Sequence, residues 1–214
     1  MQVAILGHWH TGTTLLAKTL ARCGMEVGNE NTGWGDDCVA QCEHGTLNRI
    51  GDEMVRGFDE SSGKIAPILQ SYVDEASRLG WECYGVKVTH ALHDKAWPHF
   101  RQAFKEVWPE CRYVVTVRAL IGIIESTNGD TGWGKTEVLA SYRSTLDAYR
   151  ELIDSGAAVI VFPNSYTDCR VYRLVDEIGL KWKCPPFDFK RVRTFSEAEI
   201  ANVYAPMMLE RELV

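Results

Sequence analysis

Residues 7–14 read Gly-His-Trp-His-Thr-Gly-Thr-Thr. The apolar run just before them, 3–6, is typical of a strand buried on both faces of a parallel sheet. Residues 15–22 have helical periodicity, and Gly24 is a predicted helix stop. A strand, a glycine-bounded loop and a helix in this order predict a loop whose backbone amides bind an anion such as phosphate. The alternative is a glycine turn that only connects the strand to the helix.

The loop follows the phosphate-binding pattern G-x-x-x-x-G-K-[ST] except that Thr13 replaces the lysine, while Thr14 keeps the hydroxyl. Kinases and NTPases of this class also place a carboxylate at the end of a second strand, where it holds magnesium. The predicted strand 113–117 ends instead in Arg118, and no acid directly follows the predicted strand 157–162. The pattern therefore indicates a phosphate cradle without a metal and argues against a kinase or NTPase.

Length and composition predict one soluble domain, 1–214, with a substantial core. Hydrophobic residues make up 45% and charged residues 24%, which is ordinary for a globular protein. The net charge of -6 disfavours binding to nucleic acid. No apolar run is long enough to cross a bilayer, and the basic-then-apolar pattern of a secretion signal is missing. We therefore expect a cytoplasmic protein without a nucleic-acid or membrane partner.

Seven cysteines are scattered through the chain. Their odd number fits reduced thiols in the cytoplasm. Cys38, Cys42 and His44 lie close enough in sequence to suggest zinc, but no second Cys/His pair follows at ligand spacing. We interpret them as unrelated side chains on a helix and expect no metal site.

Strands and helices alternate beyond the loop. This alternation predicts an α/β fold of the three-layer P-loop type, in which a central, mainly parallel sheet is flanked by helices. Further strands are expected at 25–27, 83–88, 112–117 and 157–162. Helices are expected at about 37–58, 65–79, 94–107, 120–126, 136–155, 168–178 and 196–208, with a linker at 59–64 and a loop at 127–134.

Three stretches together resemble the sulfotransferases that use 3′-phosphoadenosine 5′-phosphosulfate (PAPS). Residues 10–16 resemble the 5′-phosphosulfate loop of that family. Residues 113–118, with Ser126 eight positions further on, resemble its 3′-phosphate motif. Residues 85–90 resemble the strand that supplies a lysine and, in cytosolic members, a histidine to the transfer site. The order and approximate intervals agree over roughly residues 3–128.

The resemblance implies metal-independent, in-line transfer of a sulfuryl group from PAPS to a hydroxyl or amine on a small molecule, a sugar or a peptide. A sulfuryl group carries less negative charge than a terminal phosphoryl group, so amides, hydroxyls and a cation suffice to stabilise its transfer. The product nucleotide would be 3′,5′-phosphoadenosine (PAP). The residues implied to hold the donor are His10, Thr11, Gly12, Thr13, Thr14 and Leu15 at the 5′ end, and Arg118 and Ser126 at the 3′-phosphate. Arg191 and Arg193, with Lys190, are a loose substitute for the family's late basic motif at the adenosine; the alternative is a solvated basic run.

The catalytic roles rest on the same resemblance. His10 stands where the family has a lysine or arginine that neutralises the leaving group, and Lys87 is expected to supply the fixed positive charge. Two residues compete as the base that activates the acceptor. His90 resembles the histidine of the cytosolic members, whereas Glu30 lies about where tyrosylprotein sulfotransferases have a glutamate. We favour Glu30 slightly, because the late basic-glycine motif of the cytosolic members is absent.

Trp9, Trp34 and Trp133 lie on glycine-flanked loops, where they are expected to form an aromatic wall for the acceptor. Two other functions stay open. One is a nucleotide or small-metabolite kinase of the same fold, in which a lysine from elsewhere fills the cradle and magnesium is required. The other is a phosphoadenosine-binding protein without catalysis.

Overall fold

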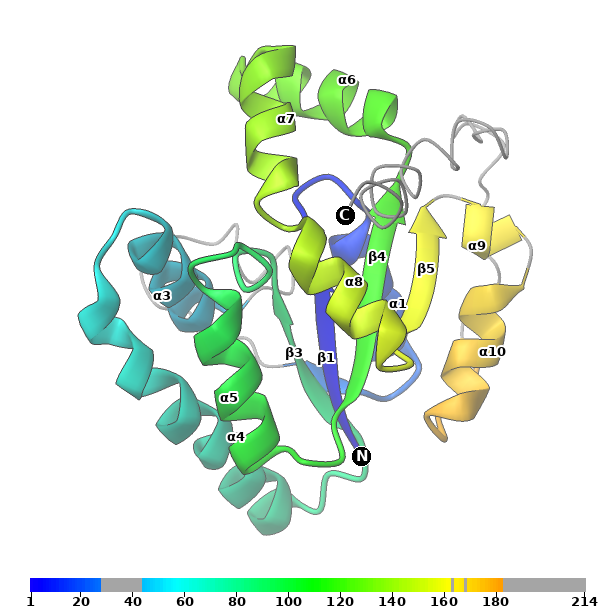
Figure 1. Cartoon of the computed structure of the whole chain (residues 1–214). Coiled ribbons are helices and arrows are strands. Elements are labelled where there is room, and N and C mark those ends of the chain that lie inside the picture. The colour runs from blue at the N-terminus through cyan, green and yellow to red at the C-terminus, as the bar shows by residue number, and fades with distance from the viewer. Residues whose placement is uncertain (28–43, 163, 168, 183–214) are drawn as a thin grey trace.

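A computed structural model describes residues 1–27, 44–162, 164–167 and 169–182. These residues contain one five-stranded sheet in the order β2-β3-β1-β4-β5, in which every neighbouring pair is parallel (Figure 1). The predicted α/β fold with a parallel sheet is therefore confirmed. The strands are β1 (Gln2–Gly7), β2 (Glu26–Val27), β3 (Tyr84–Val88), β4 (Arg112–Arg118) and β5 (Ala158–Phe162).

Helices cover both faces of this sheet (Figure 1). They are α1 (Thr13–Arg22), α3 (Gly45–Val55), α4 (Ile65–Leu79), α5 (Trp97–Val107), α6 (Leu120–Thr131), α7 (Lys135–Arg143), α8 (Leu146–Asp154), α9 (Asn164–Thr167) and α10 (Arg170–Glu177), with a short 3-10 segment, η1 (Asp59–Lys64). In the described residues, no helix is both long and apolar enough to span a membrane.

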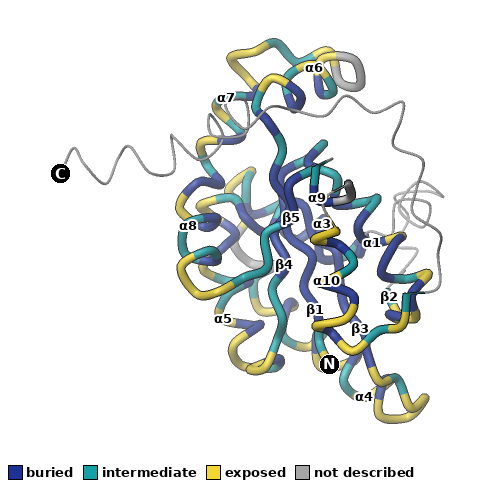
Figure 2. The backbone as a smooth tube through the Cα atoms, turned by 90° about the vertical axis from the view of Figure 1, so that its right-hand side faces the viewer, coloured by how far each residue is buried: buried dark blue, intermediate teal, exposed yellow. Residues whose placement is uncertain are grey.

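Strand β1 lies at the centre of the sheet, and its alternate side chains enter two separate hydrophobic cores. Ala4 and Leu6 pack with α3, α4, α5 and α8 on one face, whereas Val3 and Ile5 pack with α1 and α10 on the other. All four side chains are fully buried, so the strand predicted to be buried on both faces is confirmed. In Figure 2 the central strands β1 and β3 are mostly dark blue, because they are buried between the two layers of helices.

The prediction of one continuous helix at 136–155 is wrong, because the structure has two helices there, α7 and α8. The Ser144 hydroxyl donates to the Ser141 carbonyl at 2.7 Å, and the Thr145 hydroxyl donates to the Tyr142 carbonyl at 2.7 Å. Side-chain bonds to carbonyls three residues back compete with the regular helical ladder. The helix therefore stops at this pair and starts again at α8.

Other boundaries also differ from the expectations. The helix predicted at 120–126 continues to the end of α6, so the loop before α7 is shorter than expected. The stretch predicted as a linker, 59–64, is the 3-10 segment η1. In contrast, α4 has the predicted bounds and ends at Gly80, which adopts the left-handed conformation (φ 71°). The predicted helix 196–208 lies outside the described residues.

Candidate functional site

The carboxyl ends of all five parallel strands meet at one edge of the sheet, where the loop 8–12 folds over the end of β1. Gly12 caps α1 with a φ of 92°, and a Cβ added there would lie 2.6 Å from the Phe162 ring of β5. Gly7 approaches the Thr116 hydroxyl so closely that a Cβ has no room. Both loop glycines are therefore required by contacts with neighbouring strands as well as by the turn itself.

Thr11 connects the loop to the sheet through hydrogen bonds of its side chain. Its hydroxyl lies 2.6 Å from the His8 carbonyl oxygen and 2.7 Å from the Thr116 hydroxyl of β4, and its side chain is fully buried. The side chain predicted to bind the donor thus makes contacts inside the protein. Of the neighbouring predicted residues, Thr13 is buried and Leu15 packs against the core that contains α1.

Lys87 brings a positive charge to the loop from β3. Its side chain is fully buried, and its ammonium donates to the Thr14 hydroxyl at 2.7 Å. A buried ammonium is costly unless polar groups surround it or an anion neutralises it. The loop has Thr13 where the phosphate-binding pattern has lysine, and Lys87 supplies the cation that this position lacks. The predicted residues Lys87 and Thr14 are therefore in contact.

Arg118 and Ser126 both contact His10, although they belong to different elements. An Arg118 guanidinium nitrogen donates to the His10 carbonyl at 3.0 Å, and the Ser126 hydroxyl lies 3.1 Å from the His10 Nδ1. His10 has a φ of 59°, which is uncommon for a residue other than glycine. The Arg118 guanidinium also lies 5.2 Å from the centre of the Phe162 ring. Burial lowers the pKa of Arg118 and nearby Glu125 opposes this effect. An arginine nevertheless keeps its charge at neutral pH.

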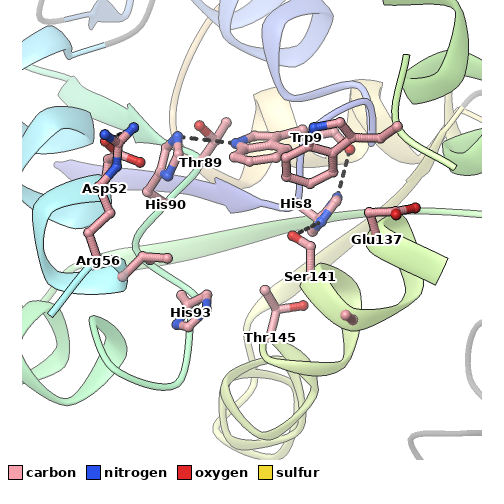
Figure 3. Close-up of a pocket in the computed structure, with 13 residues that line it drawn as sticks. His8, Trp9, Asp52, Arg56, Thr89, His90, His93, Glu137, Ser141 and Thr145 are labelled. Atoms are coloured by element: carbon pink, nitrogen blue, oxygen red, sulfur yellow. Dashed lines mark hydrogen bonds and ion pairs between the residues drawn. The ribbon is translucent and has the colours of Figure 1, made fainter. Parts of the chain in front are cut away.

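A cavity of about 710 Å³ opens beside the loop (Figure 3). Its walls come from the loop, from the turn after β3, and from α3 and α7. They combine aromatic, hydroxyl and charged side chains, which suits a small polar molecule that also has an apolar face. The lining includes His8, Trp9, Arg56, His90, Trp133 and Ser141.

The aromatic wall of this cavity is built around Trp9. The Trp9 ring contacts the Trp133 ring edge to face, with centroids 5.3 Å apart, and the His90 ring, with centroids 5.0 Å apart. The Trp9 indole N–H donates to the His90 Nε2 at 3.2 Å (Figure 3). Two of the three predicted tryptophans thus lie together at the cavity.

The turn that carries His90 is held by Asn48 of α3. The Asn48 side-chain oxygen accepts from the Thr89 amide at 2.8 Å and from the His90 amide at 3.5 Å. Sequence reasoning did not select Asn48, because a single asparagine within a helical pattern carries no distinctive signal.

Two further residues that sequence reasoning missed are His8 and Tyr149. The His8 amide donates to the Tyr149 hydroxyl at 2.7 Å, and this hydroxyl donates to the Thr116 carbonyl of β4 at 3.0 Å. Tyr149 thereby links α8 to the loop and to the sheet. The His8 side chain is buried, and this burial is the main reason that its pKa falls from 6.5 to about 4. His8 occupies a variable position of the loop pattern, so the motif itself does not point to it.

The remaining predictions lie outside the described residues. They concern Glu30, Trp34, Arg191 and Arg193. Among the described residues, no group of three or more His, Cys, Asp or Glu side chains is arranged to hold a metal ion. His44, considered above with two cysteines, caps α3 instead, because its Nδ1 accepts from the Leu47 amide at 3.2 Å.

Comparison with protein-family models gave no match, and no curated protein matches the sequence. Among solved structures, the chain is similar to a sugar kinase from Janibacter sp. whose crystal structure is unliganded. The two share 15% sequence identity with a TM-score of 0.51, over 83% of this chain and 95% of that chain. At this identity the likeness concerns the fold alone. The class defined by fold and loop is an α/β protein of the P-loop type.

Proposed function

We propose that this protein is a sulfotransferase that transfers a sulfuryl group from PAPS to a hydroxyl or amine of a small molecule in the cavity. The observation that carries the proposal is the convergence of Lys87, Arg118 and Ser126 on the loop 7–14. These residues come from β3, β4 and α6. The sulfotransferase resemblance assigns Lys87 to the transfer site and the other two to the 3′-phosphate.

Each of these residues has a distinct part in the proposed reaction. The loop amides and the Thr14 hydroxyl hold the 5′ end of the donor, which supplies an activated sulfuryl group. Lys87, already beside Thr14, stabilises the negative charge that develops on the phosphate leaving group. Arg118 and Ser126 bind the 3′-phosphate by turning from His10 to the anion. The cavity next to the loop holds the acceptor, with Trp9 and Trp133 against its apolar face.

The second candidate is a kinase that phosphorylates a sugar or another small metabolite. The comparisons favour this candidate more than the sulfotransferase, because the similar solved structure is named a sugar kinase. The kinase alternative requires a lysine from elsewhere in the chain at the phosphate-binding loop. Lys87 fits this requirement, since its ammonium donates to the Thr14 hydroxyl of the loop. The strand end at Arg118 favours sulfuryl transfer instead, because a kinase places a magnesium-binding carboxylate at such a position.

Calorimetric titration with PAP, with ADP and with ATP plus magnesium separates these functions. We expect PAP to bind without metal and at least about tenfold more tightly than ADP, since ADP lacks the 3′-phosphate and a charged hydrogen bond to that group contributes about 1.5 kcal/mol or more. Preference for ATP with magnesium would overturn the proposal in favour of the kinase. PAP binding without turnover, over a panel of sugars, phenols and amines, would point to a binding protein without catalysis.

A further inference from the structure

His8 has the hydrogen-bond pattern of a proton acceptor. Its Nδ1 lies 3.0 Å from the Trp9 carbonyl oxygen, and its Nε2 lies 2.9 Å from the Ser141 hydroxyl (Figure 3). A carbonyl oxygen only accepts, so Nδ1 carries the proton and Nε2 of the neutral ring presents a lone pair. The Ser141 hydroxyl therefore donates to Nε2. The Trp9 carbonyl orients the ring, and the lone pair is directed at a hydroxyl on the cavity wall.

The surroundings of His8 keep its ring neutral. Burial is the largest cause of the fall of its pKa to about 4, and the charges of His10 and His90 act in the same direction. The hydrogen bond to the Trp9 carbonyl opposes them. At neutral pH the ring is therefore uncharged and has one tautomer, as a general base must be before it receives a proton.

The lone pair of His90 has a different partner. Its Nε2 accepts from the Trp9 indole N–H, a group that keeps its proton at any ordinary pH. Both histidines line the same cavity, but the Nε2 of His8 faces a hydroxyl whereas the Nε2 of His90 faces an indole. An acceptor hydroxyl that takes the place of the Ser141 hydroxyl would reach His8 without any change in the aromatic wall.

We infer that His8 Nε2 accepts the proton of the acceptor hydroxyl, and that the Ser141 hydroxyl marks the place where this hydroxyl binds. The inference rests on the proposed function. The acceptor oxygen forms a bond to the sulfur, the bond from sulfur to the phosphate oxygen breaks, and the phosphate leaves with the electron pair. The acceptor proton moves to His8 Nε2 and then to solvent. An anionic donor on the adjacent loop raises the pKa of His8, which strengthens it as a base.

The test compares three histidine-to-glutamine variants by sulfate release from PAPS, with water as the acceptor hydroxyl. Glutamine at position 8 keeps a donor for the Trp9 carbonyl but lacks a base, so His8→Gln should lower kcat by about 10² or more. PAP affinity should change less than about threefold, because binding does not need the base. His90→Gln tests the competing base. Its fall in kcat should be at least about tenfold smaller than the fall for His8→Gln. His99→Gln, on α5 and outside this cavity, is the matched control.

Rescue separates a catalytic role from a structural one. Imidazole added to His8→Ala should restore sulfate release at least about tenfold, because the free base enters the space that the side chain leaves. If the wild type turns over and His8→Gln retains its rate, only this inference is wrong. If the wild type binds no PAP, or transfers no sulfuryl group to water or to any sugar, phenol or amine of the panel, the proposed function fails and the inference fails with it. If Ser141→Ala abolishes turnover while His8→Gln does not, the hydroxyl itself is the reacting group and His8 is not the base.

Discussion

Lys87 is the residue at which function and stability are expected to conflict. It is fully buried, and its ammonium donates to the Thr14 hydroxyl. Lys87→Met keeps most of the volume and removes the buried charge, a change that is often neutral or stabilising. We expect kcat to fall by about 10²–10³, as for loss of one preorganised donor, while the melting temperature stays equal or rises. Steady-state kinetics and thermal unfolding measure the two effects. An unchanged kcat would remove Lys87 from the reaction.

The proposed binding of the 3′-phosphate depends mainly on Arg118. Its guanidinium contacts the His10 carbonyl and the Phe162 ring, and it is the cation that the proposal assigns to the 3′-phosphate. Arg118→Ala should weaken PAP binding by about 10- to 100-fold, the range for a hydrogen bond to a charged group. AMP has no 3′-phosphate, so the affinity for AMP should fall much less in this variant. Calorimetry with both nucleotides measures the difference, and equal losses would contradict the assignment.

The strand–loop–helix element depends on close contacts at its glycines. Gly12→Ala places a Cβ 2.6 Å from the Phe162 ring and forces a left-handed φ of 92° on alanine. Gly80→Ala is a matched control, since its φ is 71° but nothing lies within 4 Å of the new Cβ. We expect Gly80→Ala to cost about 1 kcal/mol and Gly12→Ala at least about 2 kcal/mol.

Urea unfolding of both variants measures these costs. The double variant with Phe162→Ala makes room for the Cβ at position 12, so Gly12→Ala should cost less in that background than in the wild type. Equal costs for Gly12→Ala and Gly80→Ala would show that only the turn, and not packing against β5, requires glycine in the loop.

Helix boundaries show where element-scale prediction fails. Hydrophobic periodicity correctly places α4 and its end at Gly80, because both depend on local residues. The same periodicity runs through 144–145, where two hydroxyls bond to the preceding turn and end α7. This break matters for the site, since it lets α7 place Ser141 at the cavity while α8 places Tyr149 under the loop.

The stability of the whole molecule is expected to depend on the burial of His8. The unfolded chain takes up a proton at the ordinary pKa of 6.5, whereas the folded protein does so only at about 4. The contribution of His8 to the free energy of unfolding is therefore fully present above pH 6.5 and is lost as the pH falls from 6.5 towards about 4. The protonation of this residue is expected to lower the free energy of unfolding by about 3 kcal/mol in total and by about 2 kcal/mol at about pH 5.

Urea unfolding of the wild type and His8→Gln at neutral and mildly acidic pH measures this loss. The variant lacks the titrating group, so its stability should change less with pH than that of the wild type. The same pH dependence in both proteins would mean that the unfavourable protonation of His8 does not contribute.

The sequence by itself determined the features that depend on neighbouring residues along the chain. An apolar run followed by a glycine-bounded loop and a periodic segment requires β1, the loop and α1, because strand, turn and helix preferences are local. Alternating strands and helices likewise determined the parallel α/β class. The motifs selected Lys87, Arg118 and Ser126 as residue types suited to anions, and a resemblance to one family connected them.

Only the tertiary structure decided which of these residues touch. The strand order β2-β3-β1-β4-β5 places β3 and β4 on either side of β1, and this brings Lys87 to Thr14 and Arg118 to His10. The proton position on His8 depends on a carbonyl of the loop and a hydroxyl of α7. Contacts between residues 73 or more positions apart follow from how the sheet and its helices pack, and no local pattern contains that information.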